Sequence, residues 1–264
     1  MTAAQLINRE RVVVLGWGRA ILLQLAHPLV AAGVAAHSDF GGHRLGRLRR
    51  LHGTIGAMLD FTSGDAHRVR AAAARINAIH DRVNGRLRDN ARGYPARASY
   101  SAADPALLRW VHATLLDSIP LAYERFVAPL PKGWRDRYCE ESAETARLLR
   151  VPDGLVIAGA GELDAYLRQM LAGPAIEVTP AAREVARQLL YPPLTDPTRP
   201  AAWLVRLVTL GLLPPSVRDE YGFPWSPARE RALSVFAFLV RHALPLTPSF
   251  LRYWQPGATR RGFA

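Results

Sequence analysis

Apolar residues recur at steps of three and four along almost the whole chain, and this spacing is typical of α-helices. The chain has neither a sustained alternation of apolar and polar residues nor an Asn-Gly hairpin pattern, which would indicate β-strands. We therefore predict an all-α protein. The helices are expected over residues 9–26, 29–37, 45–62, 65–90, 104–127, 134–149, 161–172, 180–190, 200–212, 215–221, 227–243 and 247–254.

Several of these helices have start signals in the sequence. Asp104-Pro105, Thr179-Pro180 and Ser226-Pro227 each place a capping side chain before a first-turn proline. The proline-rich stretch 191–200 is the most obvious linker, but a strongly apolar segment follows it directly. We expect one large multi-helix domain over residues 1–264, with a surface loop or weak sub-boundary near 191–200.

The segment 12–36 is almost continuously apolar. Arg19 and Gln24 interrupt it, and His27-Pro28 breaks a helix near its centre. A charge in mid-span argues against a transmembrane helix, and the same residues argue against a signal peptide. We expect two packed core segments that turn near Pro28, in a soluble, cytoplasmic, bacterial protein without a membrane anchor.

Charge and cysteine content exclude several classes of protein. The net charge is +12, and Lys132 is the only lysine among 34 basic residues, but no basic run exceeds two residues. This pattern predicts no nucleic-acid binding, whereas peripheral contact with an anionic membrane surface stays compatible with it. Cys139 is the only cysteine, which excludes an internal disulfide and a thiolate metal cluster.

Short catalytic motifs are missing from the chain. It contains no His-Glu-x-x-His, no Glu-x-x-His pair and no Gly-x-Ser-x-Gly elbow, so zinc, di-iron and serine-hydrolase sites lack support. The glycine pairs Gly16-Trp17-Gly18 and Gly159-Ala160-Gly161 follow no predicted strand and are not dinucleotide fingerprints.

His80 completes an apolar helical stripe within residues 65–90. The other members of that stripe are Val69, Ala73, Ile76, Val83 and Leu87. An imidazole on the buried side of a helix must be hydrogen-bonded or bind a ligand through its lone pair. Two interpretations stay open: a core histidine that donates to a carbonyl, or a ligand of a cofactor.

Arg50 and Thr54 are four residues apart and share a face of the preceding helix. Arg50 could neutralise a carboxylate or a haem propionate, and Thr54 could hydrogen-bond a bound oxygen species. Gly53 and Gly56 leave a smooth surface beside them, which suits either a crossing helix or a flat ligand. With His80, these residues predict a cofactor pocket between consecutive helices.

The remaining histidines are interpreted as structural. His27 precedes a proline and could end its helix by donating to carbonyls, and His37 lies at a helix end before Ser38-Asp39. His112 follows Leu108 by one turn on the same helix face, which is more typical of a structural than of a catalytic histidine.

Several motifs together resemble the MpaB/latex-clearing-protein family, the rubber oxygenase catalytic domain. The resemblance covers most of the chain and weakens after about residue 190. It is carried by Asn8-Arg9-Glu10, the run from Gly18 to Pro28, His37-Ser38, Arg50-x-x-x-Thr54, Gly64, the run from Ile79 to Gly85, Tyr100-x-x-x-Asp104-Pro105, the run from Trp110 to Thr114, and the run from Tyr123 to Phe126.

The resemblance implies an all-α fold with a haem-type pocket between helices, a haem b cofactor, and oxidative cleavage of carbon–carbon double bonds in isoprenoid chains. His80 resembles the axial iron ligand, and Arg50 and Thr54 resemble the arginine and threonine beside the haem. Rubber-cleaving members carry a lysine directly before that threonine, where this chain has Gly53. Features that depend on that lysine, the rubber substrate and a six-coordinate resting state, are therefore not carried over.

We therefore expect a haem b-dependent oxygenase, with dioxygen and a small apolar, isoprenoid-like substrate as its partners. In this hypothesis His80 binds the iron, and Arg50 and Thr54 are both cofactor-binding and catalytic. The alternatives are a non-catalytic helical protein that binds haem or a lipid-like ligand, and a basic protein that binds a membrane surface or nucleic acid.

Overall fold

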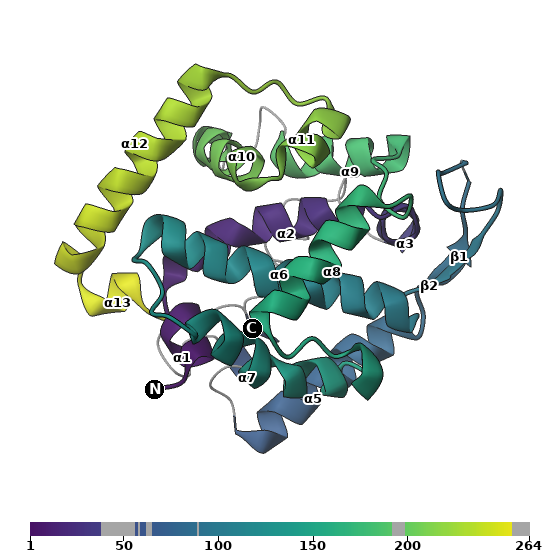
Figure 1. Ribbon diagram of the computed structural model, residues 1–264, viewed down its shortest axis with the longest axis horizontal. Helices are drawn as coiled ribbons and strands as arrows, with labels where there is room; N and C mark the ends of the chain where they lie inside the picture. Colours follow the sequence, from purple (N-terminus) through teal and green to yellow (C-terminus); the bar gives the residue numbers. More distant parts are fainter. Residues whose placement is uncertain (38–55, 58, 62–64, 89, 192–198, 255–264) are drawn as a thin grey trace.

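The computed structural model describes residues 1–37, 56–57, 59–61, 65–88, 90–191 and 199–254, and α-helices dominate this part of the chain (Figure 1). The all-α class predicted from the sequence is confirmed. The α-helices are α1 (Ala3–Asn8), α2 (Leu15–Leu25), α3 (Pro28–His37), α5 (Ala66–His80), α6 (Pro105–Phe126), α7 (Trp134–Leu148), α8 (Ala160–Ala172), α9 (Pro180–Leu190), α10 (Arg199–Leu212), α11 (Pro215–Tyr221), α12 (Pro227–Ala243) and α13 (Ser249–Arg252). Three short 3₁₀ helices are η1 (Arg11–Val14), η2 (Asp153–Leu155) and η3 (Leu244–Leu246).

The predicted caps before prolines are present in the structure. The side chain of Asp104 accepts from the backbone N–H groups of Ala106 and Leu107, and α6 begins at the next residue, Pro105. The side chains of Thr179 and Ser226 likewise cap α9 and α12. These helix starts are local features, so the sequence was sufficient to predict them.

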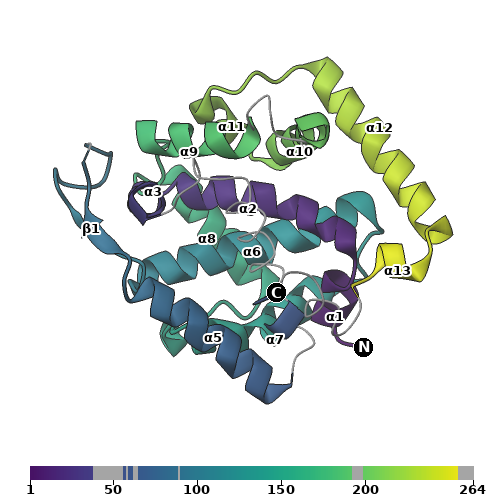
Figure 2. The ribbon, with the colours of Figure 1, turned by 180° about the vertical axis from the view of Figure 1, so that it is seen from behind.

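Helix α2 lies at the centre of the molecule, between α6 and α10 (Figures 1 and 2). The two glycines of Gly16-Trp17-Gly18 permit this packing. A Cβ at Gly16 would lie 2.5 Å from the backbone oxygen of Ser118 on α6, and one at Gly18 would lie 2.1 Å from Thr209 Oγ1 on α10. This glycine pair therefore serves close helix packing.

The chain turns sharply at His27-Pro28, as predicted. Among the described residues, no single helix is long and apolar enough to cross a membrane. The segments Arg11–Leu25 and Pro28–His37 reach that length and apolarity only together, with a bend of 107° between them. Arg19 is buried in this region and lies 2.6 Å from Asp117, and it also donates to Ser118 Oγ.

The prediction of one continuous helix over 65–90 was wrong. Helix α5 ends at His80, and the chain then enters strand β1 (Asn84–Arg86), which pairs antiparallel with β2 (Ser99–Ser101). A Cβ on Gly85 would lie 2.6 Å from the hydroxyl of Tyr100, so a glycine is needed where the strands pack. This contact is made with β2, so helical periodicity alone could not predict it.

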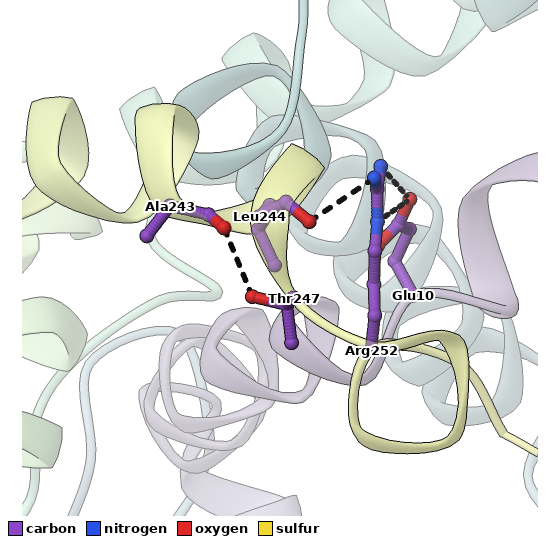
Figure 3. A network of polar contacts seen from close by, with 5 residues as sticks. All are labelled: Glu10, Ala243, Leu244, Thr247 and Arg252. Atoms are coloured by element: carbon purple, nitrogen blue, oxygen red, sulfur yellow. Dashed lines mark hydrogen bonds and ion pairs between the residues drawn. The ribbon is translucent and has the colours of Figure 1, made fainter.

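The prediction of one helix over 9–26 was also wrong, because α1 ends at Asn8 and η1 precedes α2. The segment between them is tied to the C-terminal part of the described chain (Figure 3). Arg252 donates to both carboxylate oxygens of the buried Glu10, and the backbone N–H of Trp254 donates to Arg9 O. These partners lie about 240 residues apart in the sequence.

Candidate functional site

A cavity of about 220 Å³ lies between α1, α2, α5, α6 and α7. Carbon atoms form most of its wall. The described residues that line it are Ala4, Asn8, Trp17, Ala57, Phe61, Ile76, His80, Leu108, Val111, His112, Leu115, Leu116, Ile119, Tyr138, Glu141, Ser142, Thr145, Ala146, Leu149 and Val151.

The cavity lies along α6. Its lining on this helix runs from Leu108 to Ile119, and the eleven helical steps between them span about 16 Å. Leu108 packs against Ala146 and Val151, which lie beside the end of α5, whereas the α1 residues contribute to the other end. An apolar molecule therefore matches the chemistry of this wall better than a polar one.

His80 lies at the end of the cavity where α5 meets the end of α7. One contact before His80 and one after it join the two helix ends. Asn77 Nδ2 donates to Leu148 O over 2.9 Å, and Arg150 Nη1 lies 2.5 Å from Asp81 Oδ1. These contacts hold the end of α5, and with it the backbone of His80, against the end of α7.

The His80 ring itself is half-buried, and its Nδ1 is buried without a hydrogen-bond partner among the described residues. Burial lowers the pKa of His80; the carboxylate of Asp81 opposes this effect and the guanidinium of Arg150 adds to it. The ring is therefore neutral at neutral pH. A neutral imidazole can bind a metal ion through the lone pair of one ring nitrogen.

His112 lines the same cavity, which its interpretation as a structural histidine did not anticipate. Protein atoms surround the ring, and burial lowers its pKa to about 4. His112 as a whole residue is only partly buried. The signal was present in the sequence, because Leu108, His112, Leu115 and Ile119 follow one helical stripe and all four line the cavity.

Glu141 places a carboxylate in the cavity wall, and backbone N–H groups at the start of α1 donate hydrogen bonds to both of its oxygens. The two oxygens accept from the backbone N–H groups of Ala3 and Ala4, at 3.0 and 2.7 Å. A carboxylate at a helix N-terminus neutralises unpaired N–H groups and the positive end of the helix dipole. Glu141 thus fixes α1 against α7 and is poorly placed to act as a general base.

Cys139 on α7 is buried, and burial raises the pKa of its thiol to about 12. The thiolate, which is the reactive form, is therefore scarce at neutral pH. This cysteine has the properties of a core residue.

Arg50, Thr54 and Gly53 lie outside the described residues, so their predicted roles remain predictions. Two residues that follow them in the predicted helix 45–62, Ala57 and Phe61, line the cavity. The stretches 56–57 and 59–61 are helical.

The other two candidate histidines are not among the residues of the cavity wall. His27 is buried at the α2–α3 turn, where one ring nitrogen lies 2.9 Å from the hydroxyl of Tyr94. His37, at the end of α3, lies 3.1 Å from Asn84 O through its Nε2. Both have contacts to protein that agree with a structural role.

Within the part of the chain that the structure describes, no cluster of three or more histidine, cysteine, aspartate or glutamate residues could hold a metal ion. A haem iron needs only one protein ligand, since the porphyrin supplies four. An apolar cavity with a neutral histidine in its wall suits such a group.

Comparison with known proteins identifies the family. The profile described as "ER-bound oxygenase mpaB/B'/Rubber oxygenase, catalytic domain" matches residues 4–242. The chain belongs to this family. As a member of the mpaB/rubber oxygenase family it is related to proteins with oxygenase activity, and its described cavity lies entirely within the matched residues.

Two mycobacterial proteins are similar to this family member over most of their length. They are the uncharacterised proteins Mb2261 of Mycobacterium bovis and Rv2237 of Mycobacterium tuberculosis. Each is 27% identical over 235 residues, which cover 86% of this chain and 87% of the relative. No solved structure matches the chain.

Proposed function

We propose that this protein is a haem b-dependent oxygenase that oxidises or cleaves a carbon–carbon double bond in a small apolar, isoprenoid-like substrate. The observation that carries the proposal is His80: a neutral imidazole in the wall of an apolar cavity, with a buried Nδ1 that has no partner among the described residues. Membership of an oxygenase family supports the reaction class.

In this proposal His80 holds the iron, and the contacts of Asn77 and Asp81 keep the end of α5 in place against α7. When bound, haem would supply the iron site at which dioxygen reacts with the alkene. The apolar wall would bind the hydrocarbon and exclude water. Cleavage of one double bond by one dioxygen gives two carbonyl groups, so this reaction balances without an added reductant.

Arg50 and Thr54 would complete the site from the helix predicted over 45–62. The steps from Arg50 to Thr54, to Ala57 and to Phe61 are four, three and four residues. In a continuous helix these four positions share one face, and Ala57 and Phe61 line the cavity. This spacing supports Arg50 as the partner of a haem propionate and Thr54 as a hydrogen-bond donor to the oxygen substrate.

The first experiment is reconstitution of the purified protein with haem, followed by visible absorption spectroscopy. We expect a Soret band in the wild type, its loss in H80A, and its partial return when free imidazole is added to H80A. H242A is the matched control, because His242 is exposed on α12, outside the cavity wall. A wild-type protein that stays colourless after reconstitution would refute the proposal.

The second candidate is a non-catalytic protein that binds haem or a lipid-like molecule in the same cavity. The mostly apolar wall favours it, as does the engagement of Glu141 by α1. Oxygen uptake with a panel of alkenes discriminates the two. A haem-loaded protein that consumes no oxygen with any alkene, but retains a fatty ligand in native mass spectrometry, would favour the binding protein.

A further inference from the structure

Helix α12 carries a stripe of large apolar side chains that the rest of the described chain leaves exposed. Residues at steps of three and four share a face of a helix, and Arg231, Val235, Phe238, Leu239 and His242 follow such steps. Val235, Phe238 and Leu239, in the middle of this outer stripe, are 58–60% exposed. The helix itself lies at the outer edge of the molecule in both ribbon views (Figures 1 and 2).

The opposite side of α12 is the side that packs on the protein. Leu233 and Ala237 are buried there in one apolar cluster with residues of α6 and α10. The ring of Phe236 also lies 5.7 Å from that of Phe126 on α6. A surface helix usually has one apolar side toward the core and a polar side toward water. Because α12 is apolar on both sides, packing within the protein does not explain the outer stripe.

The exposed apolar surface continues beyond the end of α12. Leu246 on η3 is 86% exposed, and Phe250 and Leu251 on α13 are 60% and 54% exposed. Both views place α13 beside the end of α12 (Figures 1 and 2). Single exposed apolar residues are common on protein surfaces, whereas a group of this kind at one edge indicates a binding surface.

The charge of this part of the chain indicates which partner the surface fits. Residues 231–254 include three arginines and no aspartate or glutamate. Arg252 is engaged by Glu10 and Arg241 by backbone oxygens, while Arg231 is exposed and has no ion pair among the described residues. The whole chain has a net charge of +12, so a second copy would be repelled. Anionic lipids supply the opposite charge in their headgroups and an apolar phase in their acyl chains.

We propose that the outer stripe of α12, with the exposed residues of η3 and α13, binds the surface of an anionic lipid membrane. The helix lies in the plane of the interface, with Phe238 and Leu239 among the acyl chains and Arg231 at the lipid phosphates. Helix α12 stays packed on α6 and α10, because its inserted and its buried side chains lie on opposite sides. This inference goes beyond the proposed function and requires neither haem nor the cavity, so either can fail alone.

The test is co-sedimentation of the whole chain with vesicles of phosphatidylcholine and phosphatidylglycerol, and with vesicles of phosphatidylcholine alone. We expect tighter binding to the anionic vesicles, weakened by salt. F238Q/L239Q should bind them at least about tenfold more weakly, because two side chains no longer insert. R231Q should lose about fivefold on anionic vesicles only. I79Q and R70Q, which change exposed residues of α5, are the matched controls and should bind as the wild type does.

A fluorescent label gives a second readout that removes little of the apolar stripe. Cys139 is buried, so a polarity-sensitive dye can be directed to the exposed position in V235C. Its emission should shift to shorter wavelengths when anionic vesicles are added, because the dye enters the interface. The same dye on I79C should show no shift. This readout decides the question if F238Q/L239Q does not fold.

Each of the following results would overturn the inference. Equal vesicle binding by F238Q/L239Q and the wild type would assign the membrane contact to another surface. Equal binding of the wild type to anionic and neutral vesicles would remove the argument from charge. No vesicle binding, with a concentration-dependent dimer that F238Q/L239Q abolishes in analytical ultracentrifugation, would make the stripe a contact between two copies of the chain. An unshifted V235C emission would place the stripe outside the bilayer.

Discussion

The ion pair between Glu10 and Arg252 should stabilise the whole fold, because it joins the two ends of the described chain (Figure 3). The Glu10 side chain is 1% exposed and that of Arg252 is 18% exposed. The guanidinium donates to both carboxylate oxygens, and a third donor nitrogen lies 3.3 Å from Leu244 O. Removal of Arg252 would leave a buried carboxylate without a cation.

Removal of one partner of a buried ion pair typically costs about 3–5 kcal/mol. Because Arg252 keeps some solvent contact, we expect R252M to lower the free energy of unfolding by about 3 kcal/mol, at the low end of that range. In a chain of this size, that loss corresponds to a decrease in Tm of roughly 6–12 °C. The double variant E10Q/R252M should be less destabilised than R252M, because no charge is left buried.

Urea unfolding of the wild type, E10Q, R252M and E10Q/R252M forms a double-mutant cycle. This cycle measures the coupling energy between Glu10 and Arg252 directly. The control is R187A, which removes an exposed ion pair with Glu184 and should cost less than about 1 kcal/mol. A loss below about 1 kcal/mol in R252M, or a double variant less stable than R252M, would refute the reasoning.

Three further predictions concern packing, pH and the cavity. G16A should destabilise the fold by about 2 kcal/mol or more in thermal unfolding, because the new Cβ meets the backbone oxygen of Ser118 at 2.5 Å; a wild-type Tm would contradict this. Burial lowers the pKa of His27 to about 4, below its unfolded value of 6.5. As the pH drops, the unfolded state therefore binds the extra proton before the folded state does. The free energy of unfolding should fall as the pH drops from 6.5 to 4. That loss, about 3 kcal/mol over the interval, should be smaller in H27Q, and equal slopes in the two proteins would be evidence against it. L115W should fill the cavity and weaken binding of haem or of an apolar ligand at least tenfold in a titration, whereas L239W on the exposed face of α12 should bind as the wild type does.

The sequence predicted the elements whose signals are local. The caps at Asp104, Thr179 and Ser226 lie next to the helices that they start, so three or four residues were enough to locate those helices. The helices predicted over 65–90 and 9–26 had wrong ends, because contacts with residues distant in the sequence determine where these helices end. Gly85 packs against Tyr100, and Glu10 pairs with Arg252, and neither contact leaves a periodic pattern in the sequence.

The candidate site was predictable only in part, for the same reason. The position of His80 on an apolar stripe indicated an inward-facing ring, and the family resemblance suggested its role. His112 likewise lies on an apolar stripe of α6. The sequence of one helix does not show which other helices that stripe packs against. Only the packing of α5, α6 and α7 brings the two rings to one cavity.

This packing also leaves little free charge in the described part of the cavity wall. Glu141 is engaged by α1, Cys139 is held as a thiol, and the histidines in the cavity wall are neutral at neutral pH. A mostly apolar wall suits a hydrocarbon, and its described part includes the imidazoles of His80 and His112 beside the hydroxyl groups of Ser142 and Thr145. In such a cavity the reactivity would come from a bound cofactor. The reaction class therefore depends on whether His80 binds iron.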